Sequence, residues 1–418
     1  MKKTITALFL LIFSYTVSIA QNIKDETVEY QYIKLPMTPL PSSVKNYQSV
    51  IIAAYEAENK KKQEQYDAEK KAADEEYQKE KEAYPAKVKA AEDRYNRELE
   101  EWKKKSFGEK VVEKQILGEN NKPVKVIPSQ PYLRQVADPE LKTSYDYPSV
   151  ANTYLRLDGF ENKADNAVRI EVTMYGFDYT EPRQLSEQKS VTSYKNGQTS
   201  TGQATYYHNE FSYRHTMSVK VTTPDGKELF GLTPQVLNTY TIFKSPESTS
   251  SVPLNPQLLI KTYEEKTLQA NLTLINNLVN DRIGYKREPR KTELYYVKSK
   301  DDTYKDLLTA FNEASSALKL LTDDEAAAKT KLQGAIQVWN TALLESDVKN
   351  KKARIDKDVT IAICFNLLEC SFAAGDFVNA EKTMASLNSI DLSSSERKKK
   401  SEYEALFNDL KKRVLANK

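Results

Sequence analysis

Residues 55–98 read YEAENKKKQEQYDAEKKAADEEYQKEKEAYPAKVKAAEDRYNRE, and this stretch decides the architecture of the chain. Tyrosine recurs in it at intervals of 11, 11, 7 and 11 residues, at Tyr55, Tyr66, Tyr77, Tyr84 and Tyr95. Eleven residues make three helical turns of about 3.67 residues, so a stripe with this period stays on one side of an almost straight helix. The Glu and Lys residues between the tyrosines are often three or four apart, which supports an exposed helix. The pattern predicts a long helical arm over residues 44–106.

Pro85 interrupts the helical pattern and leaves two arrangements of the arm open. A proline removes a helical hydrogen bond and clashes with the preceding turn, yet it fits the first position of a new helix. The arm is therefore either one helix kinked near Tyr84 or a hairpin of two helices, about 55–83 and 85–105. We favour the hairpin, because paired stripes of tyrosine and alanine could bury each other.

The five tyrosines are the predicted partner-binding residues of the arm. Few large aliphatic residues lie between them, so the helix cannot be buried on several sides. A helix that is charged over most of its surface either stands in solvent without a partner or presents its stripe to one. We expect the stripe to bind another protein, with the solvated rod as the alternative.

Residues 107–245 have the spacing of a β-rich domain. Runs of mixed polarity are separated by turn residues, and Pro-Asp-Gly-Lys at 224–227 is a turn signal between two of them. The extended runs are 111–117, 124–127, 153–157, 168–175, 190–195, 204–211, 211–221, 228–231 and 239–243. Short strands with turns between them predict an antiparallel sandwich-like domain.

Segment 21–43, upstream of the arm, is predicted to join the β-rich domain. Residues 27–34 alternate with period two, as a half-buried strand does, and the proline-rich residues 35–41 end the pattern. The arm would then be an insertion between strands of one domain, with its two ends close together. Residues 246–254 are rich in Ser and Pro and are predicted to link this domain to a helical region at 255–418.

The helical region carries a resemblance to a known family. Its candidate helices are at about 256–281, 303–321, 324–346, 353–374, 377–388 and 394–415. Residues 362–387 resemble a tetratricopeptide repeat, which is a pair of antiparallel helices with small residues where they cross. Its key positions hold Leu367, Gly375, Asp376, Phe377, Ala380, Met384 and Leu387. Residues 335–343 are similar to the second helix of such a repeat, with Ala335 at the crossing and Trp339 as the large packing residue.

This resemblance implies an irregular helical repeat domain that binds other proteins, since tetratricopeptide domains act mainly as protein-binding platforms. The alternative is a small helical bundle that supports the β-rich domain. The predicted fold is thus α+β and multidomain. An antiparallel sandwich-like domain with an inserted, coiled-coil-like helical arm is followed by a tetratricopeptide-like α-helical domain.

Residues 1–20 have the three parts of a secretory signal peptide. Two lysines precede an apolar run at 5–19, and Ser18-Ile19-Ala20 places small residues before a cut at Gln21. This ending resembles the signal peptides of Bacteroidota. The apolar run is shorter than the roughly 20 residues that span a bilayer, and no cysteine follows the cut. We expect an exported protein of the periplasm or cell surface, associated with the outer membrane, without a membrane span after cleavage.

Residues suited to catalysis or metal binding are sparse in this chain. The two histidines, His208 and His215, lie in strand-like segments, and no set of cysteines or carboxylates completes a metal site around them. Cys364 and Cys370 lie in one apolar helix without a histidine partner, so a thiol nucleophile is not indicated. Residues 197–203 have the glycine spacing of a phosphate loop but lack its Lys and hydroxyl residues. We expect no catalytic residue, cofactor or metal.

Charge and composition narrow the expected partners. The chain has 62 Lys and Arg against 59 Asp and Glu, so it has no strong overall field to attract nucleic acid. The sequence favours a non-catalytic scaffold or accessory subunit of a bacterial envelope complex for secretion, motility or outer-membrane assembly, bound to other envelope proteins. The alternative is a carbohydrate-binding envelope protein whose β-rich domain presents aromatic residues, among them Tyr206, Tyr207 and Tyr213.

Overall fold

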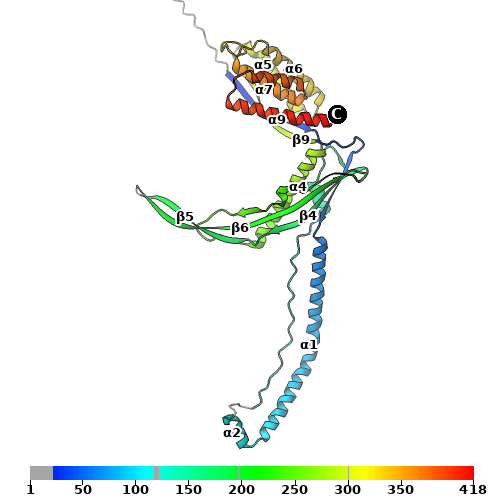
Figure 1. The fold of residues 1–418 in the computed structure, drawn as a ribbon, viewed down its shortest axis with the longest axis vertical. Helices are drawn as coiled ribbons and strands as arrows, with labels where there is room; N and C mark the ends of the chain where they lie inside the picture. Colours follow the sequence, from blue (N-terminus) through cyan, green and yellow to red (C-terminus); the bar gives the residue numbers. More distant parts are fainter. Residues whose placement is uncertain (1–21, 117–121, 196, 300) are drawn as a thin grey trace, which may run out of the picture.

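Figure 1 shows the computed structural model, which describes residues 22–116, 122–195, 197–299 and 301–418. The chain is mixed α and β, as the sequence predicts. It has three parts: a broad sheet, an arm that projects from the sheet, and a helical domain on the other side (Figure 1). The predicted signal peptide lies outside the described residues.

Seven strands form one sheet between the arm and the helical domain. They are β2 (Asn46–Ala53), β3 (Glu161–Asn162), β4 (Ala167–Tyr179), β5 (Arg183–Lys195), β6 (Gln198–Thr222), β7 (Glu228–Leu232) and β8 (Thr241–Lys244). The strand order is β3-β2-β4-β6-β5, with β7 and β8 also paired to β6. The turn predicted at 224–227 joins β6 to β7.

Helix α4 (Pro256–Ile283) packs against this sheet and forms the second layer of its core (Figure 1). Its buried apolar residues recur at helical spacing and pack with residues of β4 and β6; they are Leu268, Leu272, Ile275, Val279 and Ile283. The predicted sandwich is not confirmed, because the seven strands form a single sheet with a helix against it. Residues 246–254 also run along the sheet, where Tyr207 and Ser248 exchange backbone hydrogen bonds of 2.7 and 3.0 Å. The predicted linker is therefore part of the β-rich body, and so is α4.

Strand β1 (Asn22–Lys34) pairs antiparallel with β9 (Lys286–Lys298), and each strand has 13 residues. The strand of segment 21–43 therefore pairs with β9 and does not join the seven-stranded sheet, whereas Leu40 of the same segment packs in the core of the β-rich body. The partner strand was missed because β9 reads KREPRKTELYYVK, where charged residues obscure the alternation. This two-stranded ribbon of β1 and β9 buries Val28, Tyr30 and Leu294 in the core of the helical domain. The first described strand thus belongs to the C-terminal domain.

The helical domain contains α5 (Lys305–Leu320), α6 (Glu325–Leu343), α7 (Lys357–Ala374), α8 (Phe377–Asn388) and α9 (Ser394–Ala416), together with a short 3-10 turn at Asp302–Tyr304. Helices were predicted at these places, and the structure confirms them. Helix α7 lies at the centre, since every residue from Val359 to Phe372 is buried. One apolar core joins it to α5, α6 and the ribbon, and a second joins it to α8 and α9. A tetratricopeptide domain is not confirmed by this arrangement.

The arm is one continuous helix, α1 (Glu56–Lys104), of 49 residues with Pro85 inside it. At about 1.5 Å per residue such a helix is about 74 Å long. The predicted hairpin of two helices is wrong. The chain instead returns beside α1 as an extended segment, residues 122–146, without regular secondary structure (Figure 1). Pro85 is tolerated because Lys81, whose carbonyl loses its helical donor, is exposed to water.

The helix starts later than predicted, because residues 46–53 form strand β2. The β-branched run Val50-Ile51-Ile52 favours a strand, and the pairing of β2 with β4 provides its hydrogen bonds. The arm is inserted between these two neighbouring strands, which run parallel. A parallel pair needs a long connection, and here the arm is part of that connection.

Two extended runs predicted after the arm are helical in part. Residues 111–116 lie in α2 (Phe107–Ile116) at the far end of the arm. Residues 153 and 154 end α3 (Tyr147–Tyr154), which has Pro148 in its first turn and Asp146 as its N-cap. The Asp146 side chain accepts a hydrogen bond from the Ser149 backbone N–H, a combination that starts a helix. These capping residues outweigh the alternating pattern.

Candidate functional site

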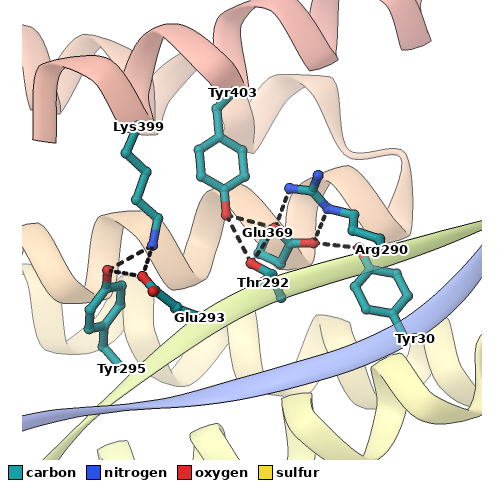
Figure 2. Close-up of polar contacts among 8 residues, drawn as sticks. All are labelled: Tyr30, Arg290, Thr292, Glu293, Tyr295, Glu369, Lys399 and Tyr403. Carbon is teal, nitrogen blue, oxygen red and sulfur yellow. Dashed lines mark hydrogen bonds and ion pairs between the residues drawn. The ribbon is translucent and has the colours of Figure 1, made fainter. Parts of the chain in front are cut away.

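A cleft of about 580 Å³ lies between strand β9 and helix α9 of the helical domain. Its walls include Glu293 and Tyr295 of β9 and Lys399 of α9. The floor contains Thr292 and Tyr403, which belong to a buried polar network (Figure 2). Both the cleft and the network were absent from the sequence prediction.

Glu369 of α7 is the centre of the network, and its side chain has no solvent exposure. The Arg290 guanidinium donates two hydrogen bonds of 2.6 Å to its two carboxylate oxygens. Tyr403 donates at 2.6 Å and Thr292 at 2.9 Å to Oε2, and the Tyr30 hydroxyl donates to Oε1. The network thereby connects β1, β9, α7 and α9 (Figure 2).

Electrostatics keep the Glu369 carboxylate ionised. Burial alone would raise its pKa, but the charge and hydrogen bonds of Arg290, with the bonds from Tyr30 and Tyr403, outweigh burial and lower the pKa. Burial raises the pKa of the Tyr403 hydroxyl, so it remains a donor. A carboxylate that accepts five hydrogen bonds has its acceptor sites occupied and is poorly placed to take up a proton. The arrangement is suited to holding four elements together.

Lys399 forms a second polar group at the side of the cleft. Its ammonium lies 3.0 Å from a Glu293 carboxylate oxygen and donates to the Tyr295 hydroxyl at 2.7 Å (Figure 2). The hydrogen bond from Lys399 lowers the pKa of Glu293. The ammonium also lies 4.5 Å from the centre of the Tyr295 ring. Aromatic, cationic and anionic groups thus meet on one wall.

Asn366 of α7 caps one position on the edge of β9. Its side-chain amide donates to the Tyr295 carbonyl at 2.7 Å and accepts from the Tyr295 backbone N–H at 2.8 Å. Only 1% of Asn366 is exposed. A side-chain amide that pairs with both backbone groups of one strand residue replaces the hydrogen bonds of a neighbouring strand.

The predicted partner-binding tyrosines face the chain itself. Tyr55 precedes α1, is buried, and donates to the Thr143 carbonyl at 2.8 Å. Tyr84 donates to the Pro128 carbonyl at 3.2 Å, and Tyr66 hydrogen-bonds to the Asp138 carboxylate, which raises its pKa. The remaining two, Tyr77 and Tyr95, are half-buried. The stripe therefore holds the returning segment at three of its five positions.

The exposed apolar side chains of the arm lie elsewhere. They are near its far end and on the returning segment, and the most exposed are Phe107 (84% exposed), Tyr132 (80%), Val124 (77%) and Val126 (65%). Sequence reasoning missed them, because they follow the periodic stretch and have no regular spacing of their own. Their identity as large apolar residues in a charged, proline-rich region is the only local signal.

The other candidate residues are buried within the fold. Burial and nearby Lys142 lower the pKa of His215 to about 4, and neither of its ring nitrogens has a hydrogen-bond partner among the described residues. Burial raises the pKa of the Cys364 thiol to about 12 and that of Cys370 well above its usual value. In the described ranges, no three His, Cys, Asp or Glu side chains are grouped so that they could hold a metal ion.

The tyrosines considered for carbohydrate binding do not form an open platform. Tyr206 and Tyr207 are half-buried, and the Lys189 ammonium lies 5.9 Å from the centre of the Tyr206 ring. Tyr213 packs against Phe211 and Tyr263 with ring centres 5.3 Å apart in both cases. The rings of Tyr206 and Tyr213 are thus engaged by contacts within the protein.

No family model, curated protein or solved structure matches this chain. Across the part of the chain that the structure describes, none of the helices combines the length and apolar character needed to cross a membrane.

Proposed function

We propose that this chain is a non-catalytic, exported scaffold or accessory subunit of a bacterial envelope complex. It binds partner proteins through the arm and through the helical domain. Secretion, motility and outer-membrane assembly machines are the classes of complex that the proposal covers. The signal-like residues 1–20 support its export to the periplasm or the cell surface, in association with the outer membrane.

The observation that carries the proposal is the exposed apolar surface of the arm. Phe107 is 84% exposed and Tyr132 is 80% exposed, although each is a large side chain whose burial is favourable. Large apolar side chains that a projecting element exposes at separate places are accessible to a partner protein, which could bury them. The tyrosine stripe has the different task of holding the arm together.

Hydrogen bonds at the base of the arm fix its direction relative to the sheet, which supports a scaffold role. Asn59 accepts from the Lys142 backbone N–H at 3.0 Å and donates to the Lys142 carbonyl at 2.7 Å. The Lys142 ammonium donates to the Tyr175 carbonyl of β4 at 3.0 Å. These bonds attach both ends of the arm to the sheet, so a partner at its far end would be held at a defined place.

The tetratricopeptide-like assignment of the helical domain belongs to this proposal. Gly375 ends α7 with a left-handed φ of 73°, as the turn between paired helices requires. Asp376 caps α8, and Ala380 is buried at the approach of the two helices. This geometry supports a repeat-like pair that presents a surface to other proteins.

A site-specific crosslinking experiment tests the arm. A photoreactive benzoyl-phenylalanine at Phe107 should form adducts with a partner protein in native membranes, and the same group at Tyr132 should do so too. The matched control is Tyr84 on the same helix, which faces Pro128 of the returning segment and should give only internal adducts.

A variant with a shortened arm provides a second, independent test. Residues 63–139 are replaced by a short Gly-Ser linker, which leaves the Asn59–Lys142 pair in place. We expect loss of co-purifying proteins while the sheet and helical domain remain folded. Unchanged co-purification, together with no adducts from Phe107 or Tyr132, would contradict the proposal.

A further inference from the structure

The direction of the backbone groups on β9 follows from its contact with Asn366. The Tyr295 N–H and C=O both bond to Asn366, so they point away from β1. In an antiparallel pair, the residues two and four positions along a strand have backbone groups that point to the same side. The backbone groups of Glu293 and Lys291 therefore also point away from β1. Pro289 is at an equivalent position of the strand. Because its backbone nitrogen points away from β1, the missing N–H removes no hydrogen bond to β1.

The outer edge of β9 is unpaired at Lys291 and Glu293. Among the described residues, none forms a hydrogen bond with the outward backbone groups of these two positions. Both residues line the cleft of about 580 Å³. The chain thus caps the edge at Tyr295, where α7 covers it, and leaves it uncapped where the cleft opens.

Helix α9 lies along the same edge and forms the opposite wall. Lys399 and Tyr403 reach from it to β9 and α7, and they cross the gap at two places (Figure 2). A further strand would lie about 4.8 Å from β9. The cleft borders β9 at Lys291 and Glu293, where a third strand would add to the β1–β9 pair.

We infer that this edge binds an extended peptide segment of a partner protein, which adds to β9 as a third strand beneath α9. The inference rests on the proposed binding role of the helical domain and names the ligand of that domain. The main chain of the peptide pairs with Lys291 and Glu293, which gives two donors and two acceptors. Strand addition of this kind takes its affinity from main-chain bonds and its specificity from alternate side chains.

The walls of the cleft define the side chains that the peptide carries. The half-buried Tyr295 provides ring surface at one end of the cleft, backed by the buried Phe365, which favours an apolar or aromatic side chain there. Lys398 and Glu402 of α9 lie on the rim and suit polar side chains at alternate positions. A strand that belongs to the sheet of a second copy would meet α9, so a single extended chain is the occupant.

Proline substitution at the edge tests the inference. Peptides are selected from a phage-displayed random dodecapeptide library on the full purified chain, and one is then labelled and measured by fluorescence anisotropy. Lys291→Pro removes the outward N–H and leaves the bonds to β1 intact, and it should weaken binding about tenfold or more. Lys291→Ala keeps the N–H and should bind within about threefold of the unsubstituted chain.

Amide hydrogen exchange on the unsubstituted chain provides a readout that does not depend on folding of the variant. Bound peptide should slow exchange at Lys291 and Glu293, with little change at Thr292 and Leu294, which face β1. Equal affinity of the Lys291→Pro chain, unchanged exchange at Lys291 and Glu293, or failure of the library to yield a binder would overturn the inference. Self-association that Lys291→Pro abolishes would do so too, because the occupant would then be a second copy. Partner adducts on the arm would still stand in each case, so the proposed function is tested separately.

Discussion

Helices α1 and α7 differ in what stabilises them: most of α1 is exposed, whereas most of α7 is buried. Helix α1 has 49 residues, of which Asn59 and Ala73 are buried, whereas the 14 residues Val359–Phe372 of the 18-residue α7 are all buried. The returning segment packs beside α1, where Tyr84 donates to the Pro128 carbonyl, and exposed ion pairs such as Lys71 with Glu75 lie on the rest of its surface. Two apolar cores support α7. The comparison shows that a long helix can be stable on the outside of this fold as well as in its core, provided that other segments contact it.

The buried polar groups of the helical domain and of the β-rich body also differ in their hydrogen bonding. Glu369 on α7 has all its acceptor sites in hydrogen bonds, while His215 near the base of the arm has none at its ring nitrogens within the described residues. A paired buried charge is costly to break, and an unpaired buried imidazole is costly to protonate. Each of the predictions below disturbs one side of this comparison.

The largest effect is expected from Glu369→Ala in the centre of the helical domain. It leaves the Arg290 guanidinium without its carboxylate, which should lower the free energy of unfolding by about 3–5 kcal/mol. Urea denaturation followed by circular dichroism measures this. Glu381→Ala, on the exposed ion pair with Lys411, is the matched control and should have little effect. A similar small effect from both would contradict a central role of the network.

Acid should destabilise the β-rich body through His215. Its pKa is about 4 when folded and about 6.5 when unfolded, so the unfolded chain takes up the proton first as the pH falls. Stability is therefore complete above about pH 6.5 and decreases by about 3 kcal/mol as the pH falls to about 4. Urea midpoints between pH 7 and 4 measure the slope. His215→Leu should flatten it, and an unchanged slope in that variant would exclude His215 as its source.

A smaller and local effect is expected at the base of the arm. Asn59→Ala removes both side-chain bonds to Lys142 and should destabilise the joint by about 1–2 kcal/mol. Amide exchange should then become faster at the start of α1 and in residues 140–146. Exchange in α7 should not change, because α7 belongs to another core. Faster exchange throughout the chain would mean that arm and helical domain unfold together.

The smallest effect is expected on the exposed side of the arm. Lys71 lies 3.9 Å from Glu75, and both side chains are more than two-thirds exposed, at 78% and 70%. Lys71→Ala should leave the urea midpoint unchanged within error, because solvent screens such pairs. A clear loss of stability would show that single charge pairs matter to this helix more than the comparison with α7 implies.

Much of the helical part of the fold could be predicted from local sequence. Asp324, Asp356, Asp376 and Ser393 cap α6, α7, α8 and α9, and a capping residue of this kind is visible in the local sequence. Two of the strands could not be predicted from their local sequence. β9 is charged along most of its exposed positions, and β2 is continuous with the pattern of the arm, so neither has a clear period of its own.

The candidate site was not predictable for a related reason. Tyr30, Arg290, Glu369 and Tyr403 come from four elements, and no spacing along the chain connects them. Glu369 looks like one of many carboxylates until its complete burial is known. The tyrosine stripe was visible as a pattern, yet the contacts that Tyr55, Tyr66 and Tyr84 make with the returning segment were not.

Local sequence specifies where most helices lie and gives the arm one side that differs from the rest. These properties depend on residues within a few turns of each other, because hydrophobic period and capping are local. Only the tertiary structure decided which partner each side meets: β1 with β9, α4 with the sheet, and the tyrosines with residues 122–146. Such pairings depend on contacts between distant segments, and many partners satisfy the same local pattern, so the completed core selects among them.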